Sequence, residues 1–218
     1  AANSAGIEPS ELTDSMVFSF AIDSQFFMQI AKLRAARKLW SAVGQVYGIK
    51  ECRMNIHAKT SMRNKSSYDR HVNLLRASNE AFAAVAGGCQ YITVDPFDAM
   101  LKEQSSQGIR MARNIVHILD KEAGIRYSED PGGGSYYLEA LTDELCEKAW
   151  ALFLDIERAG GILSVLKKGR IQAELFEIAQ TRLENVAMRK EKIIGVNVYA
   201  NPSERRPVVP VELPPSSR

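Results

Sequence analysis

Two predicted strand ends in the sequence carry the side chains best suited to chemistry. Residues 91–94, Tyr-Ile-Thr-Val, run into a turn that holds Asp95 and Asp98. Two carboxylates this close can push their pKa values apart and serve as a general acid and a general base. The alternative is structural, with Asp95 capping a turn and Asp98 beginning a helix. The turn itself holds no histidine, lysine or cysteine to act with the acids, and the structural interpretation is favoured.

The second strand end, residues 55–61, reads Asn-Ile-His-Ala-Lys-Thr-Ser. It offers His57, Lys59, Thr60 and Ser61, and a spacing of two places His57 and Lys59 on the same face of a strand. Such a pair suits the mouth of a barrel, and it suits a wet sheet edge equally well. The residues alone leave both interpretations open.

Two further polar groups are weaker candidates. The first is a polar stripe on the predicted third helix, formed by Arg110, Arg113, Asn114 and His117. Such a stripe predicts a solvated face, or alternatively a contact with an anion or a partner. The glycine-rich segment 130–137 could present amide groups to a phosphate. It lacks the spacing of known phosphate loops, so a tight connection between layers is favoured. No zinc-ligand pattern, nucleophile elbow or Walker sequence occurs, and no metal is expected.

The composition is that of an ordinary globular chain. Of 218 residues, 45% are hydrophobic and 25% charged, and the net charge of +2 points neither to nucleic acid nor to an anionic membrane surface. There is no apolar run long enough to span a membrane and no signal-peptide pattern, so we expect a cytoplasmic protein. Cys52, Cys89 and Cys146 are far apart and lack CxxC spacing, which predicts reduced core thiols.

The elements that must position the polar residues alternate between strand and helix. Strands are predicted at 16–22, 51–58 and 89–94, and helices at 24–43, 66–88 and about 107–122. This alternation predicts an α/β fold with parallel strands and right-handed crossovers. Three or four such units make half of an eight-fold barrel or a whole small open sheet. Half a barrel leaves two strand edges unpaired, so an oligomer with another copy or chain is expected.

Finer predictions concern the helix ends and faces. Ser67 is predicted to cap the second helix, whose apolar face is assigned to Val72, Leu75, Phe82 and Val85. After Pro131 the pattern becomes helical, with Thr142 as an expected N-cap.

The rest of the chain is divided by its composition. After the helix that begins near Thr142, a further helix is predicted at 169–190 and a short strand at 193–199. The expected domains are a flexible N-terminus over 1–15, a barrel-type domain with C-terminal helices over 16–200, and a proline-rich tail or linker over 201–218.

Several segments resemble one family, the coenzyme B12-dependent acyl-CoA mutases typified by methylmalonyl-CoA mutase. In family order they are FFMQIAKLRAARKLW, HAKTS, NLLRASNEAFAAVAGG, DPFDAM, IRMARN, DPGGGSYYLEALTDEL, AWALFLDIERAGG and GVNVY. The resemblance implies the second half of a TIM barrel, whose lumen holds the acyl-CoA. It also implies a helical region leading to a separate cobalamin-binding domain.

The departures from the family lie at the two strand ends. Active members resemble HSQTSGW where this chain reads HAKTSMR, so Lys59 replaces a glutamine and Met62 and Arg63 replace glycine and tryptophan. They resemble QSLHTN where this chain reads QYITVD, which puts Thr93 at the position of the active-site histidine. A threonine hydroxyl cannot be protonated near neutral pH, so no catalytic residue is expected here.

The segment ITVDPFD is instead similar to the non-catalytic small subunit of the heterodimeric bacterial mutases. That resemblance implies a silent partner of an adenosylcobalamin-dependent isomerase that interconverts methylmalonyl-CoA and succinyl-CoA in propionate metabolism. The expected partner is the catalytic large subunit or a missing barrel half, with adenosylcobalamin bound by the partner or by a missing domain. The alternative is a segment of an active mutase of altered acyl specificity. In either case the residues expected to line an acyl-CoA pocket are His57, Lys59, Thr60, Thr93 and Asp95.

Overall fold

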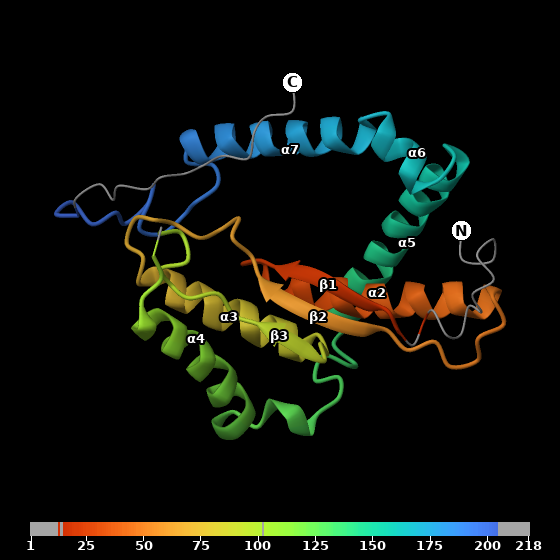
Figure 1. The fold of residues 1–218 in the computed structure, drawn as a ribbon, viewed down its shortest axis with the longest axis horizontal. Coiled ribbons are helices and arrows are strands. Elements are labelled where there is room, and N and C mark those ends of the chain that lie inside the picture. Colours follow the sequence, from red (N-terminus) through yellow and green to blue (C-terminus); the bar gives the residue numbers. More distant parts are fainter. Residues whose placement is uncertain (1–12, 14, 102, 205–218) are drawn as a thin grey trace.

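The computed structural model describes residues 13, 15–101 and 103–204. Strand and helix alternate at first, as predicted: β1 (Val17–Ile22), α2 (Phe26–Val46), β2 (Asn55–Thr60), α3 (Val72–Ala86) and β3 (Tyr91–Thr93) (Figure 1). Helices follow: α4 (Ser106–His117), α5 (Tyr136–Arg158), α6 (Ile162–Lys167) and α7 (Arg170–Ala187). Between α4 and α5 lie a π-helical turn, η2 (Ile118–Glu122), and a 3₁₀ turn, η3 (Ile125–Tyr127).

The three strands form one parallel sheet in the order β1-β2-β3. The register places Ser19 beside His57, and Lys59 beside Thr93. Each neighbouring pair of strands is joined through a helix, which is the crossover that parallel strands require. The prediction of an α/β fold with barrel-type parallel strands is confirmed. A three-stranded parallel sheet with crossover helices is consistent with part of a (β/α) barrel, which takes eight strands when closed.

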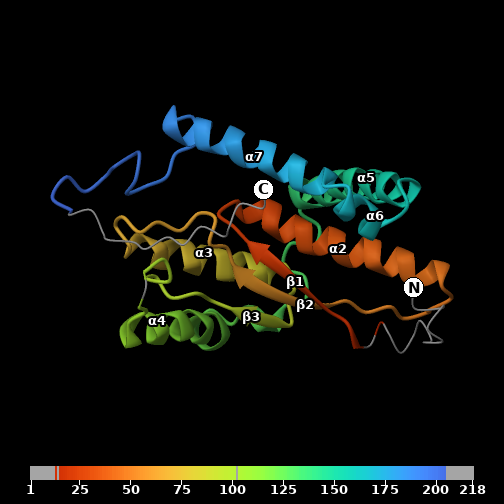
Figure 2. The same ribbon diagram turned by 45° about the horizontal axis from the view of Figure 1, so that its top comes forward.

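The core lies between the sheet and helices α2 and α3. Ile22, Ile56 and Ala58 are fully buried there, against Ile30 and Leu33 of α2. Helices α2, α3 and α4 follow one another along this side of the sheet (Figure 2). The helix predicted at 24–43 is therefore confirmed as α2, with Ile30 and Leu33 in the core.

The buried face of α3 differs from the prediction. Leu75 and Phe82, two of the large residues assigned to its core face, are 69% and 43% exposed. The buried positions of α3 are mostly small: Asn73, Ala77, Glu80, Ala81, Ala83, Ala84 and Ala86. Alanines let a helix approach a sheet closely, and choosing core residues by size selected the wrong face.

Two predicted N-caps are also wrong. Helix α3 begins at Val72, after His71, and Ser67 lies outside it. Helix α5 begins at Tyr136, where the Ser135 hydroxyl accepts a hydrogen bond from the Leu138 amide. Thr142 lies about two turns after the Ser135 cap. It is buried inside the helix and donates to the Leu138 carbonyl at 2.6 Å. In α5 the serine next to the glycine turn caps the helix earlier than the threonine would.

The strand predicted at 193–199 does not form. Ile194 and Val198 make one isolated bridge within a turn. Gly195 has a φ of 78°, and Tyr199 has a φ of 52°. The Asn197 side chain accepts from the Ile193 amide at 2.7 Å, so local side-chain hydrogen bonds replace the partner strand that this segment lacks.

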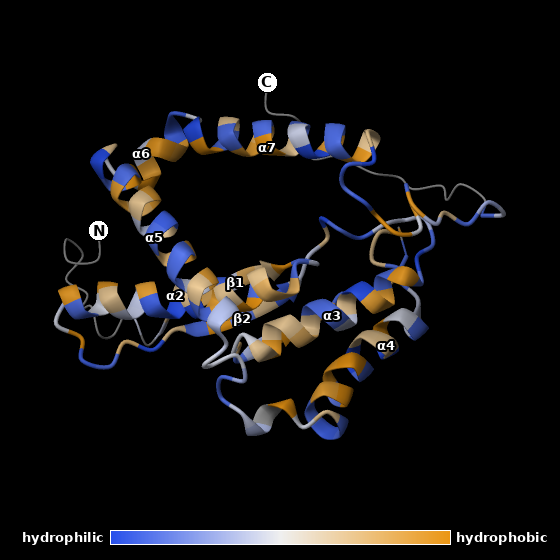
Figure 3. Cartoon of the chain, turned by 180° about the vertical axis from the view of Figure 1, so that it is seen from behind, coloured by the Kyte–Doolittle hydropathy of each residue, from blue (hydrophilic) through white to orange (hydrophobic). Residues whose placement is uncertain are grey.

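Helices α5 to α7 lead away from the sheet and then back along the upper side of the molecule (Figures 1 and 2). Helix α7 contains no buried residue, and four of its large apolar side chains are more than half exposed: Leu175, Phe176, Ile178 and Leu183. Figure 3 shows hydrophobic residues interleaved with hydrophilic ones along this helix. An amphipathic helix with an uncovered apolar face fits the expectation that the chain packs against further protein.

Several sequence expectations concern the whole chain. The expected flexible N-terminus and proline-rich tail fall mostly on residues outside the described ranges. Cys52, Cys89 and Cys146 are partly buried and are not joined in disulfides. Across the described residues, no helix combines the length and apolar character needed to cross a bilayer.

Candidate functional site

The face of the sheet opposite the core is open. Alternation along each strand points Phe20, Ile56 and Ile92 toward the helices. The intervening residues face the other way, and Val17 and Tyr91 on this side are 58% and 57% exposed. In a closed barrel this face would line the interior.

A row of three polar side chains crosses the open face. The Ser19 hydroxyl lies 2.8 Å from Nδ1 of His57, and the Thr93 hydroxyl lies 2.9 Å from Nε2 of the same ring. A neutral imidazole has one N–H donor and one acceptor nitrogen, so one hydroxyl donates to the ring and the other accepts from it. We call Ser19, His57 and Thr93 the hydroxyl–imidazole row. Both ring nitrogens of His57 are engaged within it.

Ser19 was not among the residues singled out from the sequence. A usable signal existed, because Ser19 is a hydroxyl inside an otherwise apolar strand, Val-Phe-Ser-Phe-Ala-Ile. What the sequence lacked was the register that sets Ser19 beside His57. Register between strands 38 residues apart depends on tertiary packing and not on a local pattern.

The other predicted residues meet at the C-terminal ends of β2 and β3. The Lys59 ammonium lies 3.6 Å from Oδ1 of Asp95. The Thr60 hydroxyl donates to Oδ2 of Asp95 at 3.3 Å and accepts from the Asp95 amide at 2.9 Å. Thr60 is buried and Lys59 is half exposed, so Thr60 fixes the turn while Lys59 meets solvent. The structure thus brings all five predicted residues to one end of two neighbouring strands.

The two carboxylates of the turn after β3 do not act together. Asp98 is buried, and Oδ2 of its carboxylate accepts from the Ser105 amide at 2.8 Å. A Cβ at Gly108 would fall 2.3 Å from Oδ1 of Asp98, so glycine is required where α4 packs on this acid. Asp98 therefore organises the start of α4, and the structural interpretation of the pair is the one supported.

A buried ion pair anchors the loop after β2. The Lys65 ammonium lies 2.7 and 2.6 Å from the two carboxylate oxygens of Glu80 on α3, and Asn64 Nδ2 donates to the same group at 2.6 Å. The side chains of Lys65 and Glu80 are 1% and 0% exposed. Loss of hydration raises the pKa of Glu80 and lowers that of Lys65, and each charge opposes the shift of the other. No sequence pattern revealed this pair.

Asn73 of α3 joins the loop after β2 to the turn after β3. Its Oδ1 accepts from the Ser66 amide at 3.1 Å, and its Nδ2 donates to the carbonyls of Ser66 and Phe97 at 2.7 and 2.9 Å. The side chain is fully buried. The loop that follows Lys59 and Thr60 and the turn that carries Asp95 are therefore held on one rigid helix.

The weaker sequence candidates lie away from this site. The stripe on α4 is exposed to solvent at each of its members, Arg110, Arg113, Asn114 and His117. The glycine-rich segment 130–137 connects layers, because Arg34 of α2 binds both Asp130 and Glu139 at 3.0 and 2.6 Å. Its Gly134 amide donates to Glu139, so this amide is engaged within the protein.

The site suits hydrogen bonding to a polar ligand better than acid–base catalysis. The imidazole of His57 would have to give up a hydroxyl partner to contact a ligand. Within the described part of the chain, no three His, Cys, Asp or Glu side chains are grouped so that they could hold a metal ion.

Comparison with known proteins gives a consistent picture. A family model described as "Methylmalonyl-CoA mutase" matches residues 1–217. The chain is 39% identical over 204 residues to a methylmalonyl-CoA mutase small subunit of Porphyromonas gingivalis, covering 92% of this chain and 33% of that protein. It is 38% identical over 200 residues to a small subunit of Streptomyces virginiae, with 91% and 32% covered.

A third relative is named as the mutase itself. The chain is 36% identical over 208 residues to a methylmalonyl-CoA mutase of Rhizobium meliloti, covering 94% of this chain and 29% of that protein. The chain thus spans about a third of the length of the curated relatives it matches.

Proposed function

Because this chain belongs to the methylmalonyl-CoA mutase family, we propose that it is the barrel segment of a small-subunit-type mutase polypeptide. In this role it performs no isomerisation itself. It supports a catalytic large subunit that binds adenosylcobalamin and interconverts methylmalonyl-CoA and succinyl-CoA. Two of the relatives are named as small subunits, and this supports the assignment.

The observation that carries the proposal is the state of residue 93. By the resemblance, Thr93 stands at the position where active family members carry a histidine. Its hydroxyl lies in the row with His57 on the open face. A threonine hydroxyl can donate or accept a hydrogen bond, but it supplies no proton to a thioester oxygen near neutral pH. Thr93 thus lies on the face that would line a barrel interior, but it lacks the imidazole that acid catalysis would need.

The surface formed by His57, Lys59, Thr93 and Asp95 is proposed to face the acyl-CoA side of the barrel, and the buried Thr60 holds Asp95 in place by hydrogen bonds. Lys59 is its one cation and is half exposed beside Asp95, so it is available to an anionic acyl group. A segment of an active mutase with altered acyl specificity would use the same surface. The engagement of both His57 nitrogens favours the silent role over this alternative.

Among the site residues, no imidazole nitrogen is free to bind the cobalt of adenosylcobalamin. A protein ligand to its cobalt would need a free imidazole nitrogen, and the histidine among the site residues, His57, has both nitrogens engaged by hydroxyls. His71 packs its ring against Phe97 at 4.9 Å, and His117 lies on the outer helix α4. We therefore assign the cofactor to the partner chain or to a part of the polypeptide outside these residues.

Retention of the cofactor tests the assignment. We expect that these 218 residues, incubated with adenosylcobalamin and passed through gel filtration, elute without the absorbance of the cofactor. A mixture with a catalytic mutase subunit should elute as a complex that carries both the chain and the cofactor. Cobalamin that co-elutes with the chain alone would count against the proposed function.

A further inference from the structure

An apolar groove of about 440 Å³ lies where the start of α2, the end of α3 and the start of α5 meet. None of the described residues that line it is charged. Phe27 and Phe82 of this lining are 51% and 43% exposed. The ring of Phe26 connects them, because its centroid lies 5.3 Å from that of each of the two. The groove therefore presents a connected set of aromatic rings to the surface, and we call it the aromatic groove.

An exposed stripe on α3 leads to the aromatic groove. Leu75, Asn79 and Phe82 follow one another at spacings of four and three residues, so they lie on one face of the helix, and all three are exposed. The buried face of α3 is made largely of alanines, so Leu75 and Phe82 are not used in the core. Because Phe82 belongs to both the stripe and the groove, the two form one apolar surface. Apolar surfaces of this kind mark interaction sites.

The sequence holds a segment whose composition suits aromatic rings. Residues 205–218 lie outside the described ranges and contain Pro207 and Pro210, in the spacing PxxP, followed by Leu213. A polyproline II helix has about three residues per turn, so these three side chains would share one face of it. Proline-rich segments with this spacing bind to grooves lined by aromatic side chains, because the preformed helix loses little entropy on binding.

The position of Glu204 allows this segment to reach the aromatic groove of its own chain. The Glu204 carboxylate accepts from the Asp69 amide at 2.8 Å, which holds Glu204 just before the start of α3. At a helical rise of about 1.5 Å per residue, the path from Asp69 to Phe82 is about 20 Å long. Residues 205–213 extend about 28 Å at the polyproline II rise of about 3.1 Å per residue. The segment is therefore long enough to follow the stripe into the groove.

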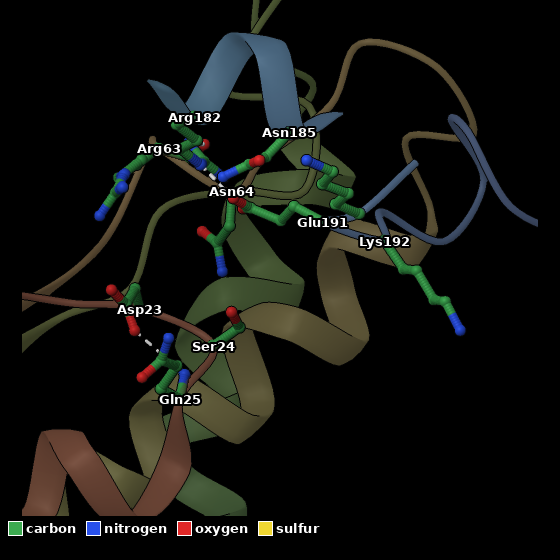
Figure 4. A pocket seen from close by; sticks show the side chains of 10 residues that line it. Asp23, Ser24, Gln25, Arg63, Asn64, Arg182, Asn185, Glu191 and Lys192 are labelled. Carbon is green, nitrogen blue, oxygen red and sulfur yellow. Dashed lines mark hydrogen bonds and ion pairs between the residues drawn. The ribbon is translucent and has the colours of Figure 1, made fainter. Parts of the chain in front are cut away.

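Another hollow, at the C-terminal ends of β1 and β2, does not suit this segment. The side chains that line it are all polar or charged, and Figure 4 shows Asp23, Gln25, Asn64 and Arg182 among them. Proline and valine side chains gain free energy by leaving water for apolar surface, and this lining offers little of it. The aromatic groove does offer such a surface.

We propose that residues 207–213 dock into the aromatic groove of the same chain as a polyproline II segment. Pro210 and Leu213 would pack on the rings of Phe27 and Phe82. The Ser135 hydroxyl at the edge of the groove accepts from the Leu138 amide, so its own proton can be donated to a carbonyl of the segment. A tethered segment has an effective concentration in the millimolar range, which favours it over a second copy at micromolar concentration. The proposal does not depend on the role of the chain in a mutase.

The test is a competition between the tethered segment and a free peptide. Replacing both Pro207 and Pro210 by alanine in the full 218-residue chain should leave the groove open. A fluorescently labelled peptide of residues 205–216 should bind this double variant saturably in an anisotropy titration. It should bind the unmodified chain about tenfold more weakly, because a tethered segment at about 1 mM competes with a peptide whose Kd is about 0.1 mM. A peptide that carries the same two alanines should not bind.

The groove is tested by further changes in the double variant. Phe82→Ser and Phe27→Ser should each weaken peptide binding about tenfold, since each removes an aromatic ring from the groove. Phe27 is half exposed, so Phe27→Ser remains informative if Phe82→Ser unfolds the chain. The matched control is Leu152→Ser, which removes an exposed apolar side chain of α5 outside the groove and should leave the affinity unchanged. Unfolding curves confirm that each variant is folded.

Three results would overturn the proposal. The first is the absence of saturable peptide binding to the double variant. The second is equal binding to the double variant and to the unmodified chain, which would show that the tethered segment does not occupy the groove. The third is peptide binding that neither Phe27→Ser nor Phe82→Ser weakens. If the double variant has a lower mass than the unmodified chain in light scattering, the segment joins two copies, and docking within one chain is wrong.

Discussion

At the scale of single residues, Thr93 determines how this site is interpreted. Its hydroxyl faces the open side of the sheet and bonds to His57, whereas its neighbour Ile92 packs on the helical layer. A larger polar side chain at 93 has space on the open face, since the flanking Tyr91 is 57% exposed. A larger polar side chain at 92 does not.

We therefore predict that Thr93→His is tolerated. Its free energy of unfolding, measured by denaturant titration, should fall by less than about 1 kcal/mol, because exposed positions rarely cost more. Restoring a histidine should leave the chain without mutase activity, because the radical chemistry belongs to the cofactor. The control is Ile92→His, which places an imidazole in the core and should cost several times as much. A loss of several kcal/mol for Thr93→His would indicate an overpacked, closed position instead.

The Lys65 and Glu80 pair makes a second prediction at this scale. Lys65→Met removes the partner of a fully buried carboxylate, and we expect a loss of about 3 to 5 kcal/mol in the free energy of unfolding. The double variant Lys65→Met with Glu80→Leu should recover much of it, because no buried charge remains. A loss below about 1 kcal/mol would mean that water reaches Glu80.

The same variant should be sensitive to pH. Burial holds the pKa of Glu80 above its ordinary value of 4.5, and without Lys65 the strongest opposing interaction is lost. A carboxyl group whose pKa is higher in the folded state stabilises the fold below the unfolded-state pKa, and this contribution is lost as pH rises toward the folded-state pKa. Lys65→Met should therefore be closer to the unmodified chain at pH 5 than at pH 8 in matched unfolding curves.

At the scale of elements, the sequence predicted regular structure well where the hydrophobic period was long. The three parallel strands and helix α2 match expectation, because each carries a period that tertiary packing reinforces. The face of α3 was missed because alanine is weak evidence in any hydrophobic pattern, yet alanine gives the closest packing. The segment 193–199 has a strand composition but no partner strand, so turn chemistry around Asn197 decides its structure.

Sequence patterns pointed to His57, Lys59 and Thr93 but missed Ser19, the Lys65 and Glu80 pair, and the connections among these residues. Strand alternation was enough to place His57 and Lys59 on one face. The bonds from His57 to Ser19 and Thr93 depend on register across the sheet, and the Lys65 and Glu80 pair depends on how a loop folds back on α3. Such contacts join residues 15 to 38 positions apart, which no local pattern records.

Helix α7 supplies the prediction at the element scale. Its apolar face is exposed in the chain by itself, so replacing Leu175 and Ile178 together by glutamate should leave the free energy of unfolding nearly unchanged. The same double variant should weaken association with the catalytic subunit or with another copy, because it places charge in an apolar contact. Light scattering measures the mass, which for the unmodified chain at micromolar concentration should exceed the monomer value of 24.2 kDa. A monodisperse monomer would contradict this prediction.

At the scale of the whole molecule, the chain leaves apolar and polar surfaces uncovered. It supplies a parallel sheet with one face packed and one face open, and helices α5 to α7 extend away from that sheet with apolar residues uncovered (Figures 1 and 3). It spans about a third of the length of its curated relatives. Under the proposed function, this chain would help to orient an acyl-CoA while a catalytic subunit carries out the chemistry.

The most direct test of this central claim is an assay of succinyl-CoA formation from methylmalonyl-CoA with adenosylcobalamin present. Three samples are compared: this chain alone, a catalytic mutase subunit alone, and the two together. We predict no turnover by the chain alone, and turnover by the mixture that exceeds that of the catalytic subunit alone. Measurable succinyl-CoA formation by the chain alone, or a mixture no more active than the catalytic subunit, would contradict it.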